Sequence, residues 1–197
     1  MQITGAYRLG ESTTNSIASG AVKKGGNSGN IALNYANGPI LLGYSYLNTK
    51  NALDNNTTRS QTAGGVYNFQ VVKLHALYFR TKNSSTVDLQ SYGLGVTVPF
   101  GAFTFLGQAG RIDNKYDKSG STLKNDDSTF FGIGTTYAFS KRTDIYLSAA
   151  KQKNKGNAVF VVTDASNAGL LTTAGATANV TPGFDPWSFH AGIRHLF

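Results

Sequence analysis

The sequence predicts an all-β fold: an up-and-down, antiparallel transmembrane β-barrel, of which this chain supplies about ten strands. Three observations predict it. Apolar residues alternate with small or polar residues at a period of two. Tight turns alternate with longer polar connections along the chain. The composition, with 23 Gly, 10 Tyr and 12 Phe but only 4 Pro, suits strands joined by turns and disfavours helices.

The composition also excludes several classes of site. There is no cysteine, which excludes disulfide frameworks, cysteine-metal sites and thiol catalysis. No run of about eighteen apolar residues occurs, so no transmembrane helix is expected. The net charge of +8 is compatible with nucleic acid, an acidic surface or the passage of anions, and the positions of the basic residues must decide among these.

The first half of the chain is expected to form five strands, at residues 2–9, 30–36, 40–49, 60–67 and 71–82. A long polar segment separates the first two strands. Asn37, Gly38 and Pro39 join the second strand to the third as a tight turn, because Asn and Gly both tolerate positive φ. A polar loop follows the third strand, and residues 68–70 turn the fourth strand into the fifth.

The second half is expected to form five more strands, at residues 87–98, 102–113, 128–139, 143–152 and 187–197. Pro99, Phe100 and Gly101 form one tight turn, and residues 140–142 form the last. A charged loop covers residues 114–127, and a longer one covers residues 153–186. All the tight turns fall at one end of the strands, whereas the longer loops fall mostly at the other. This separation is typical of outer-membrane barrels.

One face of most predicted strands is apolar and is expected to meet lipid. On the second strand Ile31, Leu33 and Tyr35 share this face. Its other members include Leu42, Tyr44, Leu74, Tyr78, Leu94, Val96, Phe131, Ile133, Ile145 and Leu147. The opposite face carries Gly, Ser, Thr, Asn and Ala, which suit a wet lumen. The fourth and seventh strands show no clear alternation.

Aromatic residues are expected to form two girdles at the membrane interfaces. The girdle near the tight turns contains Tyr35, Tyr67, Phe103, Tyr137, Phe139 and Phe197. The girdle near the longer loops contains Tyr46, Tyr78, Tyr92, Phe131, Trp187 and Phe189. Aromatic residues are also common in strands of every kind, which is the plainer explanation.

The last predicted strand resembles the terminal strand of bacterial outer-membrane proteins, whose final aromatic residue is read by the barrel-assembly machinery. This resemblance implies that Phe189, Ile193 and Phe197 form the assembly signal. His195 departs from the pattern, since many members carry an aromatic or apolar residue there. The ending from Gly192 to Phe197 is more specifically similar to that of Gram-negative trimeric porins.

Four further segments resemble the same porins and follow the same order along the chain. They are Tyr7 with Leu9-Gly-Glu11, Tyr35-Ala-Asn-Gly-Pro39, Tyr67-Asn-Phe69 with Val72-Lys-Leu74, and the segment from Tyr137 to Tyr146 around the turn Ser140-Lys-Arg142. The family's barrel has about sixteen strands. The resemblance therefore implies that residues 1–197 are the C-terminal ten strands of a porin barrel, with the other strands, the inward-folded loop and a signal peptide lying upstream.

The resemblance implies a general diffusion porin of the outer membrane, which passes small hydrophilic solutes and ions without a reaction, a cofactor or a metal. It also implies a homotrimer embedded in the bilayer and in contact with lipopolysaccharide. Alternation suggests Lys73, His75, Gln108 and Arg194 as lumen-facing residues. Basic residues near the outer rim favour anions, or they pair with lipopolysaccharide phosphates, and both interpretations stay open.

Two other functions compete with this interpretation. A ten-stranded outer-membrane hydrolase needs a carboxylate and a histidine at the rim, and only Asp88, Asp113 and His190 are available, without a nucleophile motif. A soluble β-sandwich binding module is disfavoured by the terminal strand and the girdles. Nucleic acid is not expected as a partner, because no basic helix or basic-aromatic strip occurs. We interpret the acidic residues near residues 113–127 as a solvated loop rather than a calcium site.

Overall fold

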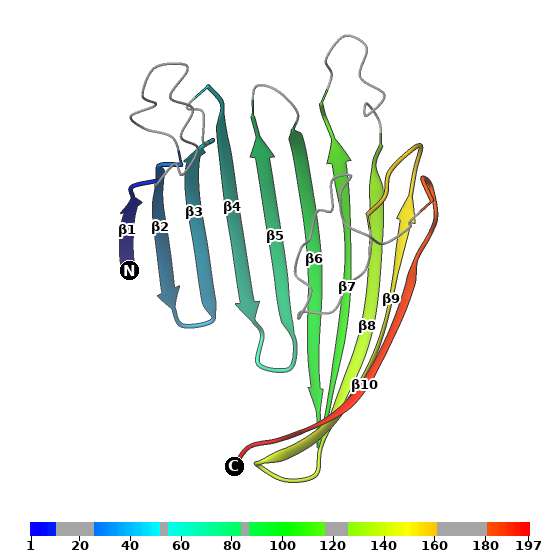
Figure 1. Ribbon diagram of the computed structural model, residues 1–197. Coiled ribbons are helices and arrows are strands. Elements are labelled where there is room, and N and C mark those ends of the chain that lie inside the picture. Colours follow the sequence, from blue (N-terminus) through cyan, green and yellow to red (C-terminus); the bar gives the residue numbers. More distant parts are fainter. Residues whose placement is uncertain (11–25, 52–54, 84–86, 117–125, 161–180) are drawn as a thin grey trace.

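The computed structural model describes residues 1–10, 26–51, 55–83, 87–116, 126–160 and 181–197. These residues form one antiparallel sheet in which each strand pairs with the next along the chain (Figure 1). The strands are β1 (Gln2–Arg8), β2 (Ser28–Asn37), β3 (Ile40–Lys50), β4 (Thr57–Asn68), β5 (Lys73–Lys82), β6 (Asp88–Phe100), β7 (Phe103–Asn114), β8 (Ser128–Ala138), β9 (Thr143–Asn154) and β10 (Trp187–His195). Among the described residues no helix has the length and hydropathy to cross a membrane.

All ten predicted strands are present, and the tight turns lie at one end of the sheet with the longer connections at the other (Figure 1). The prediction placed the turn between β6 and β7 slightly wrongly. Pro99 and Phe100 belong to β6, and the turn consists of Gly101 (φ 60°) and Ala102. β6 tolerates Pro99 because β5 pairs with it only as far as Thr97, so the missing N–H breaks no ladder bond to that neighbour.

The turn between β4 and β5 is longer than predicted, since β5 begins at Lys73 rather than at Val71. The Phe69 amide donates to the Val72 carbonyl oxygen at 2.8 Å. Gln70 has a positive φ of 74°, and its amide donates to the Asn68 side-chain oxygen at 2.9 Å. Apolar Val71 resembles a strand residue in the sequence, but the side-chain bond from Asn68 selects a turn here.

The strand register defines the two faces of the sheet, because directly paired residues point to the same side. The predicted apolar face is continuous across it: Ile31, Leu42, Leu74, Leu94, Ile133, Ile145 and Phe189 all lie on one side. The aromatic residues of both predicted girdles that lie in strands point to this side as well. Register also settles the two ambiguous strands, since Tyr67 and Phe105 share the apolar side whereas Thr62 and Gln108 lie opposite.

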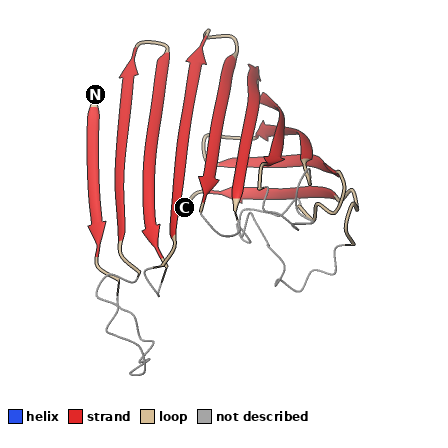
Figure 2. Cartoon of the chain, turned by 90° about the horizontal axis from the view of Figure 1, so that it is seen from above, coloured by secondary structure: helices blue, strands red, loops and turns tan. Residues whose placement is uncertain are grey.

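The sheet curls, and its C-terminal strands turn away from the plane of β1–β5 (Figure 2). The side opposite the apolar face is concave and lines an open hollow of about 1220 Å³. Within the described residues only Leu89 and Ala158 are buried hydrophobic residues, whereas Leu94 is 69% exposed and Ile133 is 71% exposed. The sheet therefore has no apolar core of its own, and its apolar side is free to contact lipid rather than a second protein layer. A single curled sheet also disagrees with the β-sandwich alternative.

Candidate functional site

The concave face carries mostly small or polar side chains, and also the larger residues Leu41, Leu77, Leu106, Phe130 and Tyr146. Its glycines are Gly43, Gly64, Gly93, Gly95, Gly110, Gly132, Gly134 and Gly192, and its small polar residues include Asn34, Ser45, Thr62, Thr97, Thr136, Ser148 and Ser188. Small residues leave space in front of the sheet, and their hydroxyl and amide groups can hydrogen-bond water. The arrangement suits a water-filled hollow rather than a packed interior.

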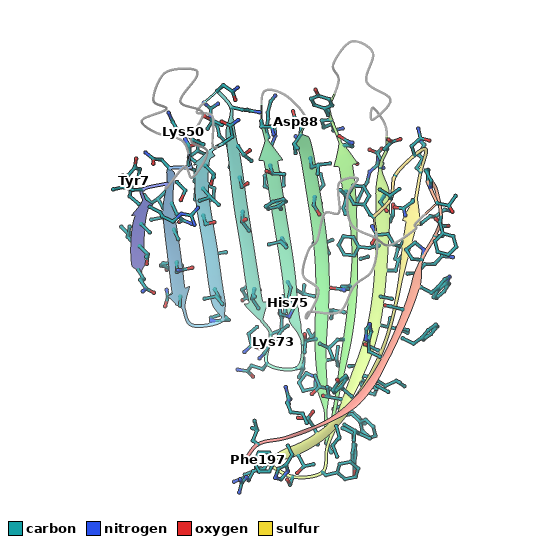
Figure 3. All side chains as sticks on the ribbon, viewed as in Figure 1. Tyr7, Lys50, Lys73, His75, Asp88 and Phe197 are labelled. Atoms are coloured by element: carbon teal, nitrogen blue, oxygen red, sulfur yellow. The ribbon has the colours of Figure 1, made fainter. Side chains whose placement is uncertain are left out.

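All four residues predicted to face the lumen lie on this concave side. Lys73 and His75 come from β5, Gln108 comes from β7 and Arg194 comes from β10. His75, Gly95, Gln108 and Gly132 share one hydrogen-bonded row, so three strands place His75 and Gln108 near each other across Gly95. The His75 Nε2 and Thr97 Oγ1 atoms are 3.1 Å apart. Figure 3 shows Lys73 and His75 together near the tight-turn end of β5.

The basic residues of the concave face differ in their partners. The Arg194 Nη2 and Nε atoms donate to Asp144 Oδ2 at 2.6 and 3.0 Å, so a neighbouring carboxylate offsets this charge. Lys73 is exposed, and no described carboxylate lies within salt-bridge distance of it. Arg8 also lies on this face, directly opposite Ser28. The alternation along β1 could have identified it in the sequence, because Ile3, Gly5 and Tyr7 point to one side and Arg8 therefore points to the other.

The rim residues of the strands point to the opposite, membrane-facing side. Arg80, Lys82, Arg111, Lys151 and Lys153 all share the face that carries Leu74, Tyr92 and Phe131. Arg80 and Lys82 both contact Asp88, at 3.3 and 3.0 Å, and Arg111 contacts Asp113 and Asp127. The Lys151 Nζ atom lies 4.6 Å from the centre of the Trp187 ring. Of the two interpretations of the rim, this orientation favours contact with anionic lipid over direct contact with solutes in the hollow.

The residues available to the hydrolase alternative do not form a group. Asp88 and Asp113 lie on the membrane-facing side, where basic residues neutralise them. His190 lies on the concave side, opposite Ser148. The sheet therefore separates the two carboxylates from the histidine. Asp113 and Asp127 are bound by Arg111 rather than arranged as calcium ligands, and Asp117 lies outside the described residues.

The C-terminal strand carries Phe189 and Ile193 on the membrane-facing side, 73% and 69% exposed. The backbone pairing of β10 with β9 ends at His195, and Phe197 follows it. The Leu196 amide donates to the Arg142 carbonyl oxygen at 2.8 Å, and Arg142 Nε donates to the Leu196 carbonyl oxygen at 2.7 Å. These bonds hold the chain next to the last tight turn. The Phe197 ring is fully exposed apart from an edge contact with His195, with ring centres 5.0 Å apart.

Comparison with known proteins gives relatives of one kind. A family model described as Gram-negative porin matches residues 1–157. An outer membrane porin protein of Bordetella pertussis is 31% identical over 153 residues, which are 62% of this chain and 40% of that protein. Outer membrane porin protein 32 of Delftia acidovorans is 30% identical over 169 residues, which are 83% of this chain and 44% of that protein. This chain thus spans about two fifths of the length of these curated relatives.

Two solved structures share the fold. An anion-selective porin from Comamonas acidovorans superposes with a TM-score of 0.69 at 24% identity, covering 89% of this chain and 50% of that one. A second porin superposes with a TM-score of 0.55 at 17% identity, covering 76% of this chain and 52% of that one. Both are β-barrels, and the curled sheet described above matches about half of each barrel.

Proposed function

The chain belongs to the Gram-negative porin family, and from this we propose that it forms wall strands of an outer-membrane channel for passive diffusion of small hydrophilic solutes and ions. One observation carries the proposal: a single curled sheet has an exposed apolar convex side and a hollow concave side on which small or polar residues predominate. Such a sheet can contact lipid with its apolar side and water with its polar side. No reaction or cofactor enters the proposal.

We also propose that further strands complete the barrel. Within the described residues β1 pairs only with β2, and β10 pairs only with β9, so each has one open backbone edge. An open edge in lipid leaves N–H and C=O groups unsatisfied, at several kcal/mol each. The proposed assembly is therefore a porin barrel to which residues 1–197 contribute ten C-terminal strands, with the completed protein as a homotrimer. Lipopolysaccharide and the barrel-assembly machinery are its proposed contacts in the outer membrane.

The distribution of charge supports a preference for anions. Within the strands, the concave face carries Arg8, Lys73 and Arg194 but only one carboxylate, Asp144. The other two strand carboxylates, Asp88 and Asp113, point to the membrane-facing side. A lumen wall with surplus positive charge lowers the energy of an anion in the channel and raises that of a cation.

Planar-bilayer recordings of the completed protein under a salt gradient test this proposal. The double variant Arg8→Glu with Lys73→Glu is expected to move the reversal potential towards cation preference, because it inverts two exposed charges on the lumen wall. The control is Lys151→Glu with Lys153→Glu, which makes the same charge change on the membrane-facing side. An unmoved reversal potential, or an equal shift in the control, would contradict the proposed anion preference. Absence of any conductance would contradict the channel itself.

A further inference from the structure

A groove follows β6 along the concave face and opens into the hollow. Its floor is bare backbone at Gly93 and Gly95, which both lie on the concave side. Leu77 and His75 stand directly opposite these glycines on β5 and form one wall. Along this wall an apolar residue and a polar residue follow each other at a spacing of about 7 Å. The groove therefore has an apolar part and a polar part.

The Phe130 ring forms the second wall of the apolar part. It extends from β8 across Gly110 and reaches β6. A carbon atom at the Cβ position of Gly93 would lie 3.7 Å from Phe130 Cζ and 3.9 Å from Leu77 Cβ. Both distances are ordinary van der Waals contacts. The gap between Leu77 and Phe130 therefore accepts one layer of carbon atoms, which is the thickness of a flat ring.

Within the described residues, the immediate neighbours leave the groove open. Leu77 is 53% exposed, so its apolar surface is free towards the hollow. Gln108 stands opposite Gly95 on β7, but its side chain lies over Gly132 on β8, where a Cβ atom would be 3.0 Å from Gln108 Nε2. The floor at Gly95 is therefore accessible to a solute in the hollow.

The polar part of the groove carries positive charge. Lys73 and Thr97 stand directly opposite each other, two residues from His75 and Gly95 along their strands. The His75 Nε2 and Thr97 Oγ1 atoms are 3.1 Å apart. Lys73 and His75 come from the same end of β5 (Figure 3), and no described carboxylate lies within salt-bridge distance of Lys73. This part of the groove is complementary to an anion.

We propose that the groove binds a small, planar aromatic carboxylate, with its ring between Leu77 and Phe130 and its carboxylate over Gly95 towards Lys73. The ring removes apolar surface from water, and the ammonium group of Lys73 stabilises the carboxylate. This inference rests on the proposed function, because it requires solutes to pass along the concave face. It adds the class of solute that this wall retains.

The test measures how strongly organic anions interrupt the chloride current of the completed protein in planar bilayers. Benzoate, cyclohexanecarboxylate and acetate are added at constant ionic strength, and the half-blocking concentration is measured for each. We expect that of benzoate to be about tenfold lower than that of acetate, because only benzoate covers the apolar walls. Cyclohexanecarboxylate has the same charge but a thicker, puckered ring, so it should block less strongly than benzoate.

Leu77→Thr removes the apolar wall and keeps a good strand residue. It should raise the half-blocking concentration of benzoate about fivefold and leave that of acetate unchanged. The matched control is Leu41→Thr, since Leu41 lines the same hollow from β3 and is 51% exposed. It should leave both concentrations unchanged. Gly93→Ala places a methyl group in the gap at ordinary contact distances and should also weaken block by benzoate.

Lys73→Gln tests the polar part of the groove. It should raise the half-blocking concentrations of benzoate and acetate alike by about threefold, since both carboxylates lose the same cation. Arg8→Gln is the control, because it removes the same charge from the same face at β1. Four strand spacings, about 20 Å, separate β1 from β5, so screening should limit its effect to less than about 1.5-fold.

Three results would overturn the inference: equal block by benzoate and acetate, stronger block by cyclohexanecarboxylate than by benzoate, or equal effects of Leu77→Thr and Leu41→Thr. The first result would indicate that another segment of the completed barrel covers the groove. In each case chloride still passes, so the proposed function stands. A protein without chloride conductance would contradict the proposed function and this inference together. Heat-dependent mobility on gels verifies that each variant is folded.

Discussion

At the scale of single residues, glycines on the concave face make room for neighbouring aromatic rings. Phe130 lies against Gly110, where a Cβ atom would overlap both the ring and the Tyr92 carbonyl oxygen. Tyr146 lies across Gly192 on the next strand in the same way. Each ring covers backbone that a glycine exposes and lies flat on the wall instead of projecting into the hollow. Glycine thus serves two purposes here, because it widens the hollow and positions the ring.

Gly110→Ala should destabilise the folded sheet by about 1–3 kcal/mol, because the Tyr92 backbone oxygen cannot move aside without breaking the β6–β7 pairing. The matched control is Gly93→Ala on the neighbouring strand, where a Cβ would meet Phe130 at an ordinary 3.7 Å. Heat-dependent mobility on gels and urea unfolding in detergent measure the difference. Equal unfolding midpoints for the two variants would show that Gly110 is not required for this packing.

Arg194 and Asp144 make opposite contributions to the charge of the proposed lumen. Arg194→Gln removes the cation and leaves the Asp144 carboxylate without its partner, so the reversal potential should shift towards cation preference. Adding Asp144→Asn should return the potential close to that of the unmodified protein, because the double variant has the same net charge. The measurement is the planar-bilayer recording described above. A double variant that keeps the full shift would contradict this role of the pair.

At the scale of elements, the residues that pair within β10 are distinct from the final aromatic residue, which lies beyond the strand. Phe189 and Ile193 lie within the β9–β10 register, whereas Phe197 follows the last paired residue, His195. The ring of Phe197 contacts only His195 among the described aromatic rings. The strand therefore forms without it. This separation is what a terminal residue needs if another protein is to read it.

Deletion of Phe197 should leave the unfolding midpoint of refolded protein unchanged and lower the amount in the outer membrane severalfold. The reason is that its exposed ring contributes little to the sheet, while the proposed assembly signal includes it with Phe189 and Ile193. Ala191→Gly, on the same face of β10 but inside the paired strand, should have the reverse effect and reduce stability. Unchanged outer-membrane yield under low expression would remove the assembly role from Phe197.

At the scale of the whole molecule, the register shows that the sheet is sheared in the way a tilted barrel requires. One hydrogen-bonded row runs from Tyr35 on β2 to Phe131 on β8. The row lies two residues from the turn end of β2, at Asn37, but seven residues from the turn end of β8, at Ala138. With the turns in one plane, this stagger corresponds to a strand tilt of about 30°. Outer-membrane strands tilt by a similar angle.

The shear also explains how one row can join both aromatic girdles. Tyr35 belongs to the girdle near the tight turns, and Phe131 belongs to the girdle near the longer loops, yet both lie in the same row. When the strands tilt, a hydrogen-bonded row crosses the membrane obliquely, so its two ends lie near opposite membrane interfaces. The sequence-based assignment of each aromatic residue to a girdle is consistent with the register for this reason.

The sequence by itself determined the number, order and direction of the strands, and the apolar face of most of them. Turn formation and the alternation of side chains depend on residues that are close in sequence. The turn at Gly38 and the apolar side of Ile31 can therefore be predicted without knowledge of distant segments. The resemblance to the porin family followed from local motifs of the same kind, which are spread in order over almost the whole chain. The turn that contains Gln70 was expected at the right place but too short, because the side-chain bond from Asn68 outweighed the strand propensity of Val71 and β5 begins only at Lys73.

Only the tertiary structure decided which side each residue of β4 faces and which charges pair. β4 carries small residues on both sides, with Thr62 and Gly64 on one and Ala63 and Gly65 on the other. The alternation along this strand therefore does not distinguish an apolar side from a polar side. Asp144 meets Arg194 across fifty residues of sequence, and Arg59 meets Lys82 on the next strand. These neighbours are set by the register between strands. Register depends on the pairing of whole strands, which no single strand encodes.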